Sequence, residues 1–300
     1  MSIKSFKQLL NRVSEMEKHK IAVAMAQDSE VLLAMHAAQS AGLAEAILVG
    51  DRDEIYRQAE KKHIDVQEYE IVDIKDEQKS IWEAVELVRS GEAQVIMKGL
   101  CSTANFLKGI LNKEHGLRAA ELLSHLAIFE SPNYSKLLFM SDAAMNIAPD
   151  LKMKISITQN AIQAARALGY KRPKVAMLSA VEKVNATGMP SSAEAAIIAK
   201  MGERGQLGEV VIDGPLALDN ALSPEANRIK KLNSSVGGRA DICIVPNIEA
   251  GNIFYKLMTT LGNALVAGVV LGASVPVVLT SRADSQNAKF LSIVTALAIS

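Results

Sequence analysis

Short apolar runs alternate with longer amphipathic stretches along the first third of the chain. Four of the apolar runs are typical of buried strands: KIAVAMA (20–26), EAILVG (45–50), YEIVD (69–73) and AQVIMKG (93–99). Helical patterns separate them, such as DSEVLLAMHAAQSAG (28–42), which begins with an Asp cap and ends at a glycine. Strands and helices that alternate with short connections predict right-handed βαβ units and a mostly parallel sheet.

Two closely spaced apolar runs interrupt this alternation within residues 123–142. LSHLAIFES and SKLLFMSD predict an antiparallel hairpin or insertion. The strand–helix pattern then resumes, and the total of about ten strands exceeds what one compact sheet usually holds. We therefore expect two α/β domains with a cleft between them, and NIAPDLKMK (146–154) as the crossing from one to the other.

The composition excludes several classes of protein. Hydrophobic residues make up 49% of the 300 residues and aromatic ones only 4%, which predicts an aliphatic core. Lys and Arg number 33, as do Asp and Glu, so no overall field favours nucleic acid. The two cysteines lack CxxC spacing, which argues against a disulfide framework or a zinc site. The N-terminus is charged, and the longest apolar run (264–279) contains glycines and a proline, which predicts a cytoplasmic protein outside the membrane.

Five polar motifs stand where expected strands end. In an open parallel sheet, ligands bind beyond the carboxyl ends of the strands. We therefore expect one ligand-binding cleft to be lined by MKGLCSTANFLKG (97–109), MSDAAMNIAP (140–149), IDGPLALDNA (212–221), VPNIEAGNIFYK (245–256) and TSRADS (280–285).

The first motif places Lys98 and Gly99 at a strand end and Thr103 at a helix start. Backbone N–H groups and the helix dipole can hold an oxyanion there. The alternative is an ordinary helix cap beside a solvated lysine. Neither the GxxxxGK[ST] frame nor GxGxxG occurs in the chain, so the usual nucleotide-binding fingerprints are missing.

The fourth motif carries Glu249, Asn252, Tyr255 and Lys256 on one strand-to-helix transition. The helical spacing places three of them on one face, which predicts the lining of a site rather than a solvated surface. In the third motif, Asp213 and Asp219 fit structural capping as well as function. The five histidines show neither ligand spacing nor a Ser/His/Asp order, so we expect no metal site.

The last motif has a fixed positive charge and hydroxyl groups at positions where ordinary turns have Gly, Pro, Asn or Asp. Arg282 supplies the positive charge, and Ser281 adds a hydroxyl donor. An anionic ligand is therefore expected at this strand end.

These motifs together resemble the phosphotransacylase family, and in particular its phosphate butyryltransferase branch. The resemblance rests on KG followed by TANFLKGILNKEHGLR, on SDAAMNIAP, IDGPLALDNA, IEAGNIFYK and LTSRADSQNAK, in this order over essentially the whole chain. It implies two α/β/α domains with a cleft between them, like those of the isocitrate and isopropylmalate dehydrogenases. The first would span residues 1–148 and 271–300, and the second residues 149–270.

The resemblance also implies a reaction. Butanoyl-CoA and phosphate would give butanoyl phosphate and CoA, by direct attack on the acyl carbonyl, in short-chain fatty acid metabolism. CoA would be a substrate or product, no cofactor would be needed, and the protein would form a homodimer or a higher homo-oligomer. A phosphate acetyltransferase and a non-catalytic acyl-CoA-binding protein are the alternatives, and the preferred acyl chain stays open.

Site residues follow from the same resemblance. Related phosphate acetyltransferases carry the pair matched by Ser281 and Arg282 in their active site, with a catalytic aspartate six residues after the arginine. That position is Ala288 here, so Asp284 is expected as a base only by proximity. The residues expected to bind substrate are Lys98, Gly99, Thr103, Asn146, Glu249, Asn252, Tyr255 and Lys256.

Overall fold

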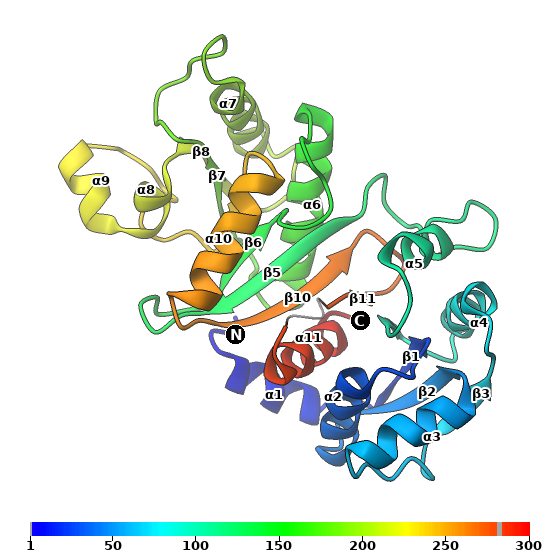
Figure 1. Cartoon of the computed structure of the whole chain (residues 1–300). Helices are drawn as coiled ribbons and strands as arrows, with labels where there is room; N and C mark the ends of the chain where they lie inside the picture. Colours follow the sequence, from blue (N-terminus) through cyan, green and yellow to red (C-terminus); the bar gives the residue numbers. More distant parts are fainter. Residues whose placement is uncertain (1, 281–283) are drawn as a thin grey trace. The chain divides into compact units, whose positions relative to one another are not determined.

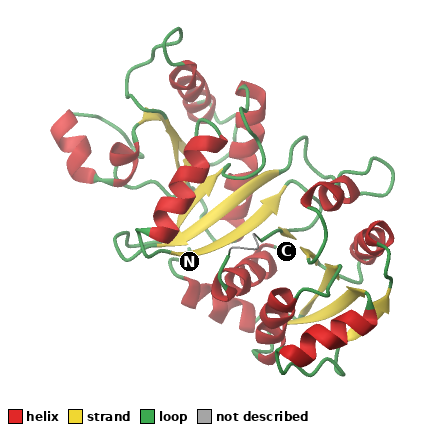
Figure 2. Ribbon diagram, viewed as in Figure 1, coloured by secondary structure: helices red, strands yellow, loops and turns green. Residues whose placement is uncertain are grey.

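The computed structural model describes residues 2–280 and 284–300, which divide into two compact units. The first, which we call the N-terminal unit, combines Phe6–Glu121 with Ala267–Ser300. The second, the central unit, combines Leu122–Val266 with the first five residues. Both units contain strands and helices (Figures 1 and 2), so each is an α/β unit, as the sequence predicts.

The N-terminal unit is built on strand–helix repeats. Its elements are α1 (Phe6–Ser14), β1 (His19–Ala24), α2 (Ser29–Ser40), β2 (Ala44–Gly50), α3 (Arg52–Lys61), β3 (Glu70–Asp73), α4 (Glu77–Arg89), β4 (Val95–Lys98), α5 (Thr103–Ile110), β10 (Leu265–Leu271), β11 (Val277–Val278) and α11 (Gln286–Ile299). The strand order is β3-β2-β1-β4-β11-β10, and every pair is parallel except β11 with β10. The predicted mostly parallel sheet is confirmed.

Local sequence explains where these helices begin. Asp28, Asp51 and Asp76 each accept hydrogen bonds from backbone N–H groups of the first turn of α2, α3 and α4, respectively. Most side chains of helix α11 from Ala288 to Ala298 are apolar and buried, and the helix packs against α1 and α2. The last segment of the chain therefore belongs to the core of the N-terminal unit.

The central unit holds the predicted hairpin. Its elements are β5 (Ser124–Glu130), β6 (Leu138–Ser141), α6 (Leu151–Ala167), β7 (Lys174–Leu178), α7 (Pro190–Glu203), β8 (Val211–Leu216), α8 (Leu218–Leu222), α9 (Pro224–Lys230), β9 (Ile242–Ile244) and α10 (Ile248–Thr260). The strand order is β5-β6-β9-β7-β8. β5 and β6 are antiparallel and the other pairs are parallel, which confirms the hairpin.

The division of the chain differs from the expected one. Residues 122–148 belong with 149–266, because β6 forms a parallel pair with β9 about a hundred residues later. The segment 146–154 is no crossing: Asp150 caps α6 inside the central unit, where its side chain accepts from the backbone N–H of Met153 at 2.8 Å. The crossings lie after Ser5, Glu121 and Val266, so the boundaries expected at 148 and 270 move accordingly.

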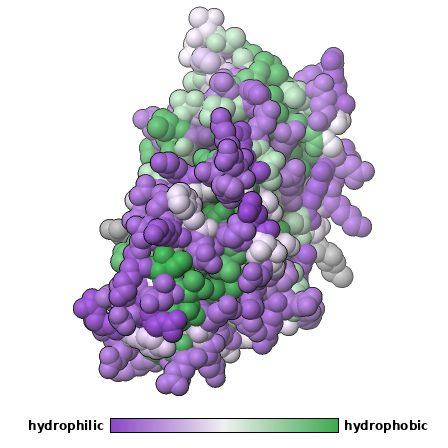
Figure 3. Space-filling view, turned by 90° about the vertical axis from the view of Figure 1, so that its right-hand side faces the viewer, coloured by the Kyte–Doolittle hydropathy of each residue, from purple (hydrophilic) through white to green (hydrophobic). Residues whose placement is uncertain are grey.

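The surface is mixed in character. The face seen in Figure 3 carries mainly hydrophilic side chains, with hydrophobic ones in smaller areas between them. In the part of the chain that the structure describes, no helix combines the length and apolarity needed to cross a membrane.

Candidate functional site

The end of β4 lies against the end of β1. Gly99 donates its N–H to the carbonyl oxygen of Ala24 at 2.8 Å, and Leu100 donates to that of Met25 at 2.7 Å. A Cβ atom on Gly99 would stand 2.1 Å from the Met25 carbonyl oxygen. The glycine is therefore required by a close backbone contact, whatever its part in ligand binding.

Lys98 is not the solvated lysine that the sequence left as an alternative. Its ammonium group donates to the carbonyl oxygens of Gly99, at 3.1 Å, and of Cys101, at 3.0 Å. An ammonium group has three donors, so one remains for a ligand. Lys98 forms no ion pair within the described residues. The loop therefore holds a positive charge close to the sheet edge.

The start of α5 is an ordinary helix cap. The Ser102 hydroxyl accepts from the backbone N–H of Asn105 at 3.1 Å, and Thr103 is exposed. A Glu77 carboxylate oxygen accepts from the Ser102 N–H at 3.3 Å and from the Asn105 amide at 2.8 Å. The anion at this helix start is thus a side chain of the protein, and the sequence analysis missed it because Glu77 reads as a common first-turn acid of α4.

The strand that precedes the TSRADS motif lies beside β4. Val278, the last residue of β11, pairs with Met97 of β4, so the two strands end at neighbouring positions. Ser281 and Arg282 lie outside the described residues. Asp284 and Ser285 lead into α11, where the Ser285 hydroxyl caps the helix by accepting from the N–H of Ala288 at 3.2 Å.

Lys289 anchors the start of α11. Its ammonium group is nearly buried, with 3% of the residue exposed, and donates to the carbonyl oxygen of Asp284 at 2.7 Å. A buried cation needs partners, and this bond ties the helix to Asp284 of the motif. Ala288 is also buried, so the position of the family aspartate faces the protein interior.

In the central unit, the loop after β6 is held by buried polar side chains. Asp142 accepts from the backbone N–H groups of Ala144 and Met145, at 2.9 and 3.0 Å. Asn146 donates to the second carboxylate oxygen of Asp142 at 2.5 Å and to the carbonyl oxygen of Leu123 at 2.9 Å. Asn146 therefore fixes the loop, and its expected contact with substrate stays a prediction.

Helix α10 packs directly on this loop. A Cβ on Gly251 would stand 2.5 Å from the Asp142 carbonyl oxygen, so only glycine allows the approach. Asn247 caps the helix by accepting from the N–H of Ala250 at 2.9 Å. Because β6 and β9 are parallel neighbours, the second and fourth motifs meet at one edge of the central unit.

The expected residues of α10 have different surroundings. Glu249, Asn252 and Lys256 are exposed. The half-buried Tyr255 ring lies edge-on to His125 and Phe129, with centroids 6.3 and 5.7 Å away. The Lys256 ammonium lies 5.2 Å from the centroid of the Tyr255 ring. Tyr255 thus stands between the core and the exposed helix face.

His125 is the residue that the sequence analysis missed here. It is buried at the start of β5, and its carbonyl oxygen accepts from the Ser141 hydroxyl at 2.8 Å. Because β5 runs antiparallel to β6, the first residues of β5 lie where β6 ends. The predicted hairpin was the signal that could have placed this histidine at the edge.

The two acids of the third motif, Asp213 and Asp219, make structural contacts within the protein. The Asp213 carboxylate accepts from the N–H of Gly214 at 2.8 Å. Asp219 lies 3.1 Å from the Lys230 ammonium, which also donates to Glu182 at 2.6 Å. The hydrogen bonds to Glu182 and Asp219 raise the pKa of Lys230, so these acids serve an ion-pair network.

Neither cysteine is an activated thiol. Burial raises the pKa of Cys101 to about 11, although the Lys98 charge acts in the opposite direction. Burial also raises the pKa of Cys243 to about 12. A nucleophilic cysteine needs a lowered pKa, and burial acts in the opposite direction on both thiols. Within the described residues, no group of three or more His, Cys, Asp or Glu side chains is placed to hold a metal ion.

The expected site residues fall into two groups. The N-terminal unit contributes Lys98, Gly99, Thr103 and Asp284 at the edge where β4 and β11 end. The central unit contributes Asn146, Glu249, Asn252, Tyr255 and Lys256 at the edge where β6 and β9 end. Each group lies at the carboxyl ends of neighbouring parallel strands, which is where an open α/β sheet binds ligands.

Comparison with known proteins identifies similar chains. The family model "Phosphate acetyl/butaryl transferase" matches residues 5–83 and 77–297. The phosphate butyryltransferase of Clostridium beijerinckii is 48% identical over 293 residues, which are 98% of this chain and 97% of that protein.

Solved structures are similar as well. A branched-chain phosphotransacylase from Enterococcus faecalis V583 has a TM-score of 0.82 at 36% identity, over 94% of this chain and 98% of its own. A 4-hydroxythreonine-4-phosphate dehydrogenase from Klebsiella pneumoniae has a TM-score of 0.60 at 11% identity, over 94% of this chain and 99% of its own. The second likeness concerns the fold alone, and it confirms the dehydrogenase-like α/β architecture.

Proposed function

Since the chain belongs to the phosphate acetyl/butyryl transferase family, we propose that it catalyses the conversion of butanoyl-CoA and inorganic phosphate to butanoyl phosphate and CoA. The observation that carries the proposal is 48% identity to a phosphate butyryltransferase across 98% of the chain. Membership of the family makes the chain an acyltransferase. The butanoyl group is the finer part of the proposal, because the family description includes acetyl transfer.

The reaction exchanges one bond to the acyl carbonyl for another. A phosphate oxygen attacks the thioester carbon, a tetrahedral oxyanion forms, and the carbon–sulfur bond breaks to release CoA as its thiolate. In the reverse direction the CoA sulfur attacks and phosphate leaves. Both directions need a polyanion held against a carbonyl carbon, so fixed donors and positive charges supply much of the stabilisation.

In this proposal the site residues of the N-terminal unit bind phosphate. Arg282 grips it with two hydrogen bonds and Ser281 adds a hydroxyl donor. Support comes from Lys98, whose ammonium is fixed at the neighbouring strand end with one donor still available. Gly99 and the exposed Thr103 complete the loop from which backbone and hydroxyl donors can reach an anion.

Asp284 is the proposed base that takes the thiol proton of CoA in the reverse direction. A free thiol with a pKa near ~8.5 is already a few per cent thiolate at neutral pH, and nearby cations increase that fraction. General-base catalysis by Asp284 therefore needs to contribute only a modest part of the rate enhancement. The family aspartate is replaced by the buried Ala288, which leaves Asp284 as the acid of this motif.

The site residues of the central unit are proposed to bind acyl-CoA. Glu249, Asn252 and Lys256 are exposed on α10 and can reach polar parts of CoA, while Tyr255 offers an aromatic edge beside apolar core residues. Asn146 holds the loop against which α10 packs.

The activity test follows CoA release from butanoyl-CoA with a thiol reagent, with and without phosphate. The proposal predicts release that depends on phosphate, together with an acyl phosphate product that reacts with hydroxylamine. Comparison of acetyl-, butanoyl- and isobutanoyl-CoA ranks the acyl chains, since one methylene is worth only ~1–3 kcal/mol. Binding of butanoyl-CoA without any release would favour the non-catalytic acyl-CoA-binding alternative.

The remaining features of the proposal concern the whole protein. We propose a homodimer or higher homo-oligomer and a cytoplasmic location. No cofactor is proposed, because moving an acyl group between two substrates involves no change of oxidation state. Light scattering of the purified chain determines its mass in solution and tests the oligomer.

A further inference from the structure

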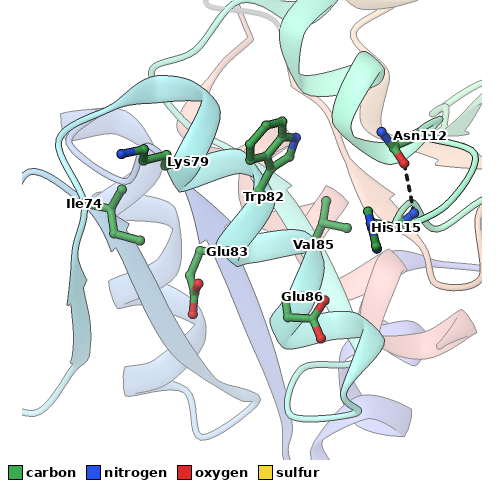
Figure 4. A pocket seen from close by; sticks show the side chains of 8 residues that line it. All are labelled: Ile74, Lys79, Trp82, Glu83, Val85, Glu86, Asn112 and His115. Carbon is green, nitrogen blue, oxygen red and sulfur yellow. Dashed lines mark hydrogen bonds between the residues drawn. The ribbon is translucent and has the colours of Figure 1, made fainter.

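A pocket of about 470 Å³ lies on the outer side of α4 in the N-terminal unit, apart from the strand-end motifs (Figure 4). It is lined by Ile74, Lys79, Trp82, Glu83, Val85, Glu86, Asn112 and His115. We infer that this pocket binds a purine nucleotide group, with its base stacked on Trp82. The inference does not depend on the proposed acyltransferase activity.

Trp82 provides the stacking surface. It is the single tryptophan of the chain, and it is 54% exposed even though it lies beside a concave surface. Val85, which is buried, and Ile74 add apolar surface to the lining. An indole ring with an open face binds a planar aromatic ring favourably and with little loss of side-chain entropy, and base–aromatic stacking is worth ~1–3 kcal/mol.

Asn112 provides hydrogen-bond donors on one side of Trp82. Its amide oxygen accepts from the backbone N–H groups of Glu114, at 3.0 Å, and His115, at 2.9 Å. The amide nitrogen is turned towards the side on which Trp82 lies (Figure 4), and within the described residues it forms no hydrogen bond. Purine ring nitrogens are acceptors and suit such a donor.

Lys79 and Glu83 provide the charged groups on the other side. Neither side chain forms an ion pair or hydrogen bond among the residues that the structure describes. Glu86 is already paired with Arg89 at 2.8 Å, and this hydrogen bond is the main cause of its lowered pKa. The unused groups are therefore one cation and one anion, which suit a phosphate and the hydroxyls of a ribose.

Other ligand classes fit less well. An apolar chain would leave the amide of Asn112 and the charges of Lys79 and Glu83 covered without partners. A simple anion would leave the Trp82 face unused and would lie near two carboxylates. A nucleotide uses the aromatic face, the amide donor and the cation together. Free nucleotides and the adenosine end of CoA share this chemistry.

Calorimetric titration of the full chain with AMP, adenosine, ribose 5-phosphate and CoA tests the inference. AMP should bind one site per chain and quench Trp82 fluorescence with the same dissociation constant, whereas ribose 5-phosphate should do neither. Trp82→Leu, which keeps apolar bulk without the ring, should weaken AMP binding at least about tenfold. Displacement of AMP by CoA would identify the adenosine end of CoA as the source, and its absence a free nucleotide.

Two variants probe the polar groups separately. Lys79→Ala should weaken AMP at least about fivefold and leave adenosine unchanged, because only AMP carries the phosphate. Asn112→Asp keeps the oxygen that holds the turn but removes the amide donor, so it should weaken adenosine at least about fivefold. Absence of saturable AMP binding, or binding that Trp82→Leu leaves unchanged, would overturn the inference. Turnover of butanoyl-CoA, measured in the same preparations, reports on the proposed function independently.

Discussion

Gly99 has a structural reason for its identity as well as an expected functional one. Its N–H pairs with Ala24, and the carbonyl oxygen of Met25 occupies the space that a side chain would need. Neighbouring residues also have contacts within the loop. The Lys98 ammonium donates to the carbonyl oxygen of Cys101, and the Glu77 carboxylate accepts from the N–H of Ser102. At the scale of single residues, the candidate phosphate loop is thus held by hydrogen bonds within the protein, while one donor of the Lys98 ammonium stays available.

Gly99→Ala should destabilise the protein by ~1–3 kcal/mol, because the backbone segments that follow β1 and β4 must separate to admit a methyl group. Thermal unfolding measures the loss. Gly50→Ala is the matched control, since its nearest neighbour is the end of the Gln27 side chain rather than a backbone atom. Equal melting temperatures for Gly99→Ala and wild type would show that the close contact is not rigid.

Arg282→Gln should lower kcat/KM by at least about two decades, with Arg282→Lys in between. The change removes charge-assisted hydrogen bonds worth ~1.5–3 kcal/mol each, and lysine restores the charge but not the fork. Asp284→Asn should lower kcat with little effect on the KM for phosphate. If Arg282→Gln turns over at the wild-type rate but melts earlier, the arginine serves folding and the phosphate assignment fails.

Cys101 should resist alkylation in the folded protein at neutral pH. Its raised pKa, about 11, keeps it protonated there, and the reactive species is the thiolate. Mass spectrometry after iodoacetamide treatment should find both cysteines unmodified in the native chain and modified in urea. An acylated cysteine recovered from a reaction with butanoyl-CoA would contradict direct attack on the carbonyl.

At the scale of elements, parallel neighbours bring the motifs together. In the N-terminal unit, β4 ends in the first motif beside β11, the strand before the fifth motif. In the central unit, β6 and β9 bring the second and fourth motifs together. Helix α10 packs on the loop after β6 through Gly251, and the Lys289 ammonium of helix α11 donates to the carbonyl oxygen of Asp284. Helix α10 therefore holds the second motif in place, and helix α11 holds Asp284 of the fifth motif.

Lys289→Met should leave the fold intact while lowering activity several-fold. Methionine fills the buried space of the lysine stem and removes the cost of a buried cation, so stability should hold or rise. The bond to the Asp284 carbonyl oxygen is lost, which should raise the KM for phosphate. Lys256→Met, an exposed lysine of α10, is the comparison for the loss of charge and should leave the KM for phosphate unchanged.

At the scale of the whole molecule, the chain passes between two units three times. The last segment of the chain completes the N-terminal unit with β10, β11 and α11, and the first five residues belong to the central unit. There the Tyr170 hydroxyl donates to the carbonyl oxygen of Ile3 at 2.6 Å. Each unit thus depends on segments far apart in the sequence.

Turnover should survive exhaustive treatment with EDTA. Phosphate attack on a thioester can be assisted by Arg282 and Lys98 alone, without a Lewis acid. Activity is measured before and after dialysis against the chelator, with thermal unfolding as a check on the fold. Activity that disappears and returns with a divalent ion would show that a metal takes part.

The amino-acid sequence by itself determined the alternation of strands and helices, the hairpin, and the motifs that resemble the family. These features depend on the spacing of neighbouring residues, which is legible without a structure. Only the tertiary structure decided which strands are neighbours, and with them the division of the chain at Glu121 and Val266. It also revealed Glu77, His125 and Lys289, whose roles arise from contacts with other elements or from burial that no local pattern records.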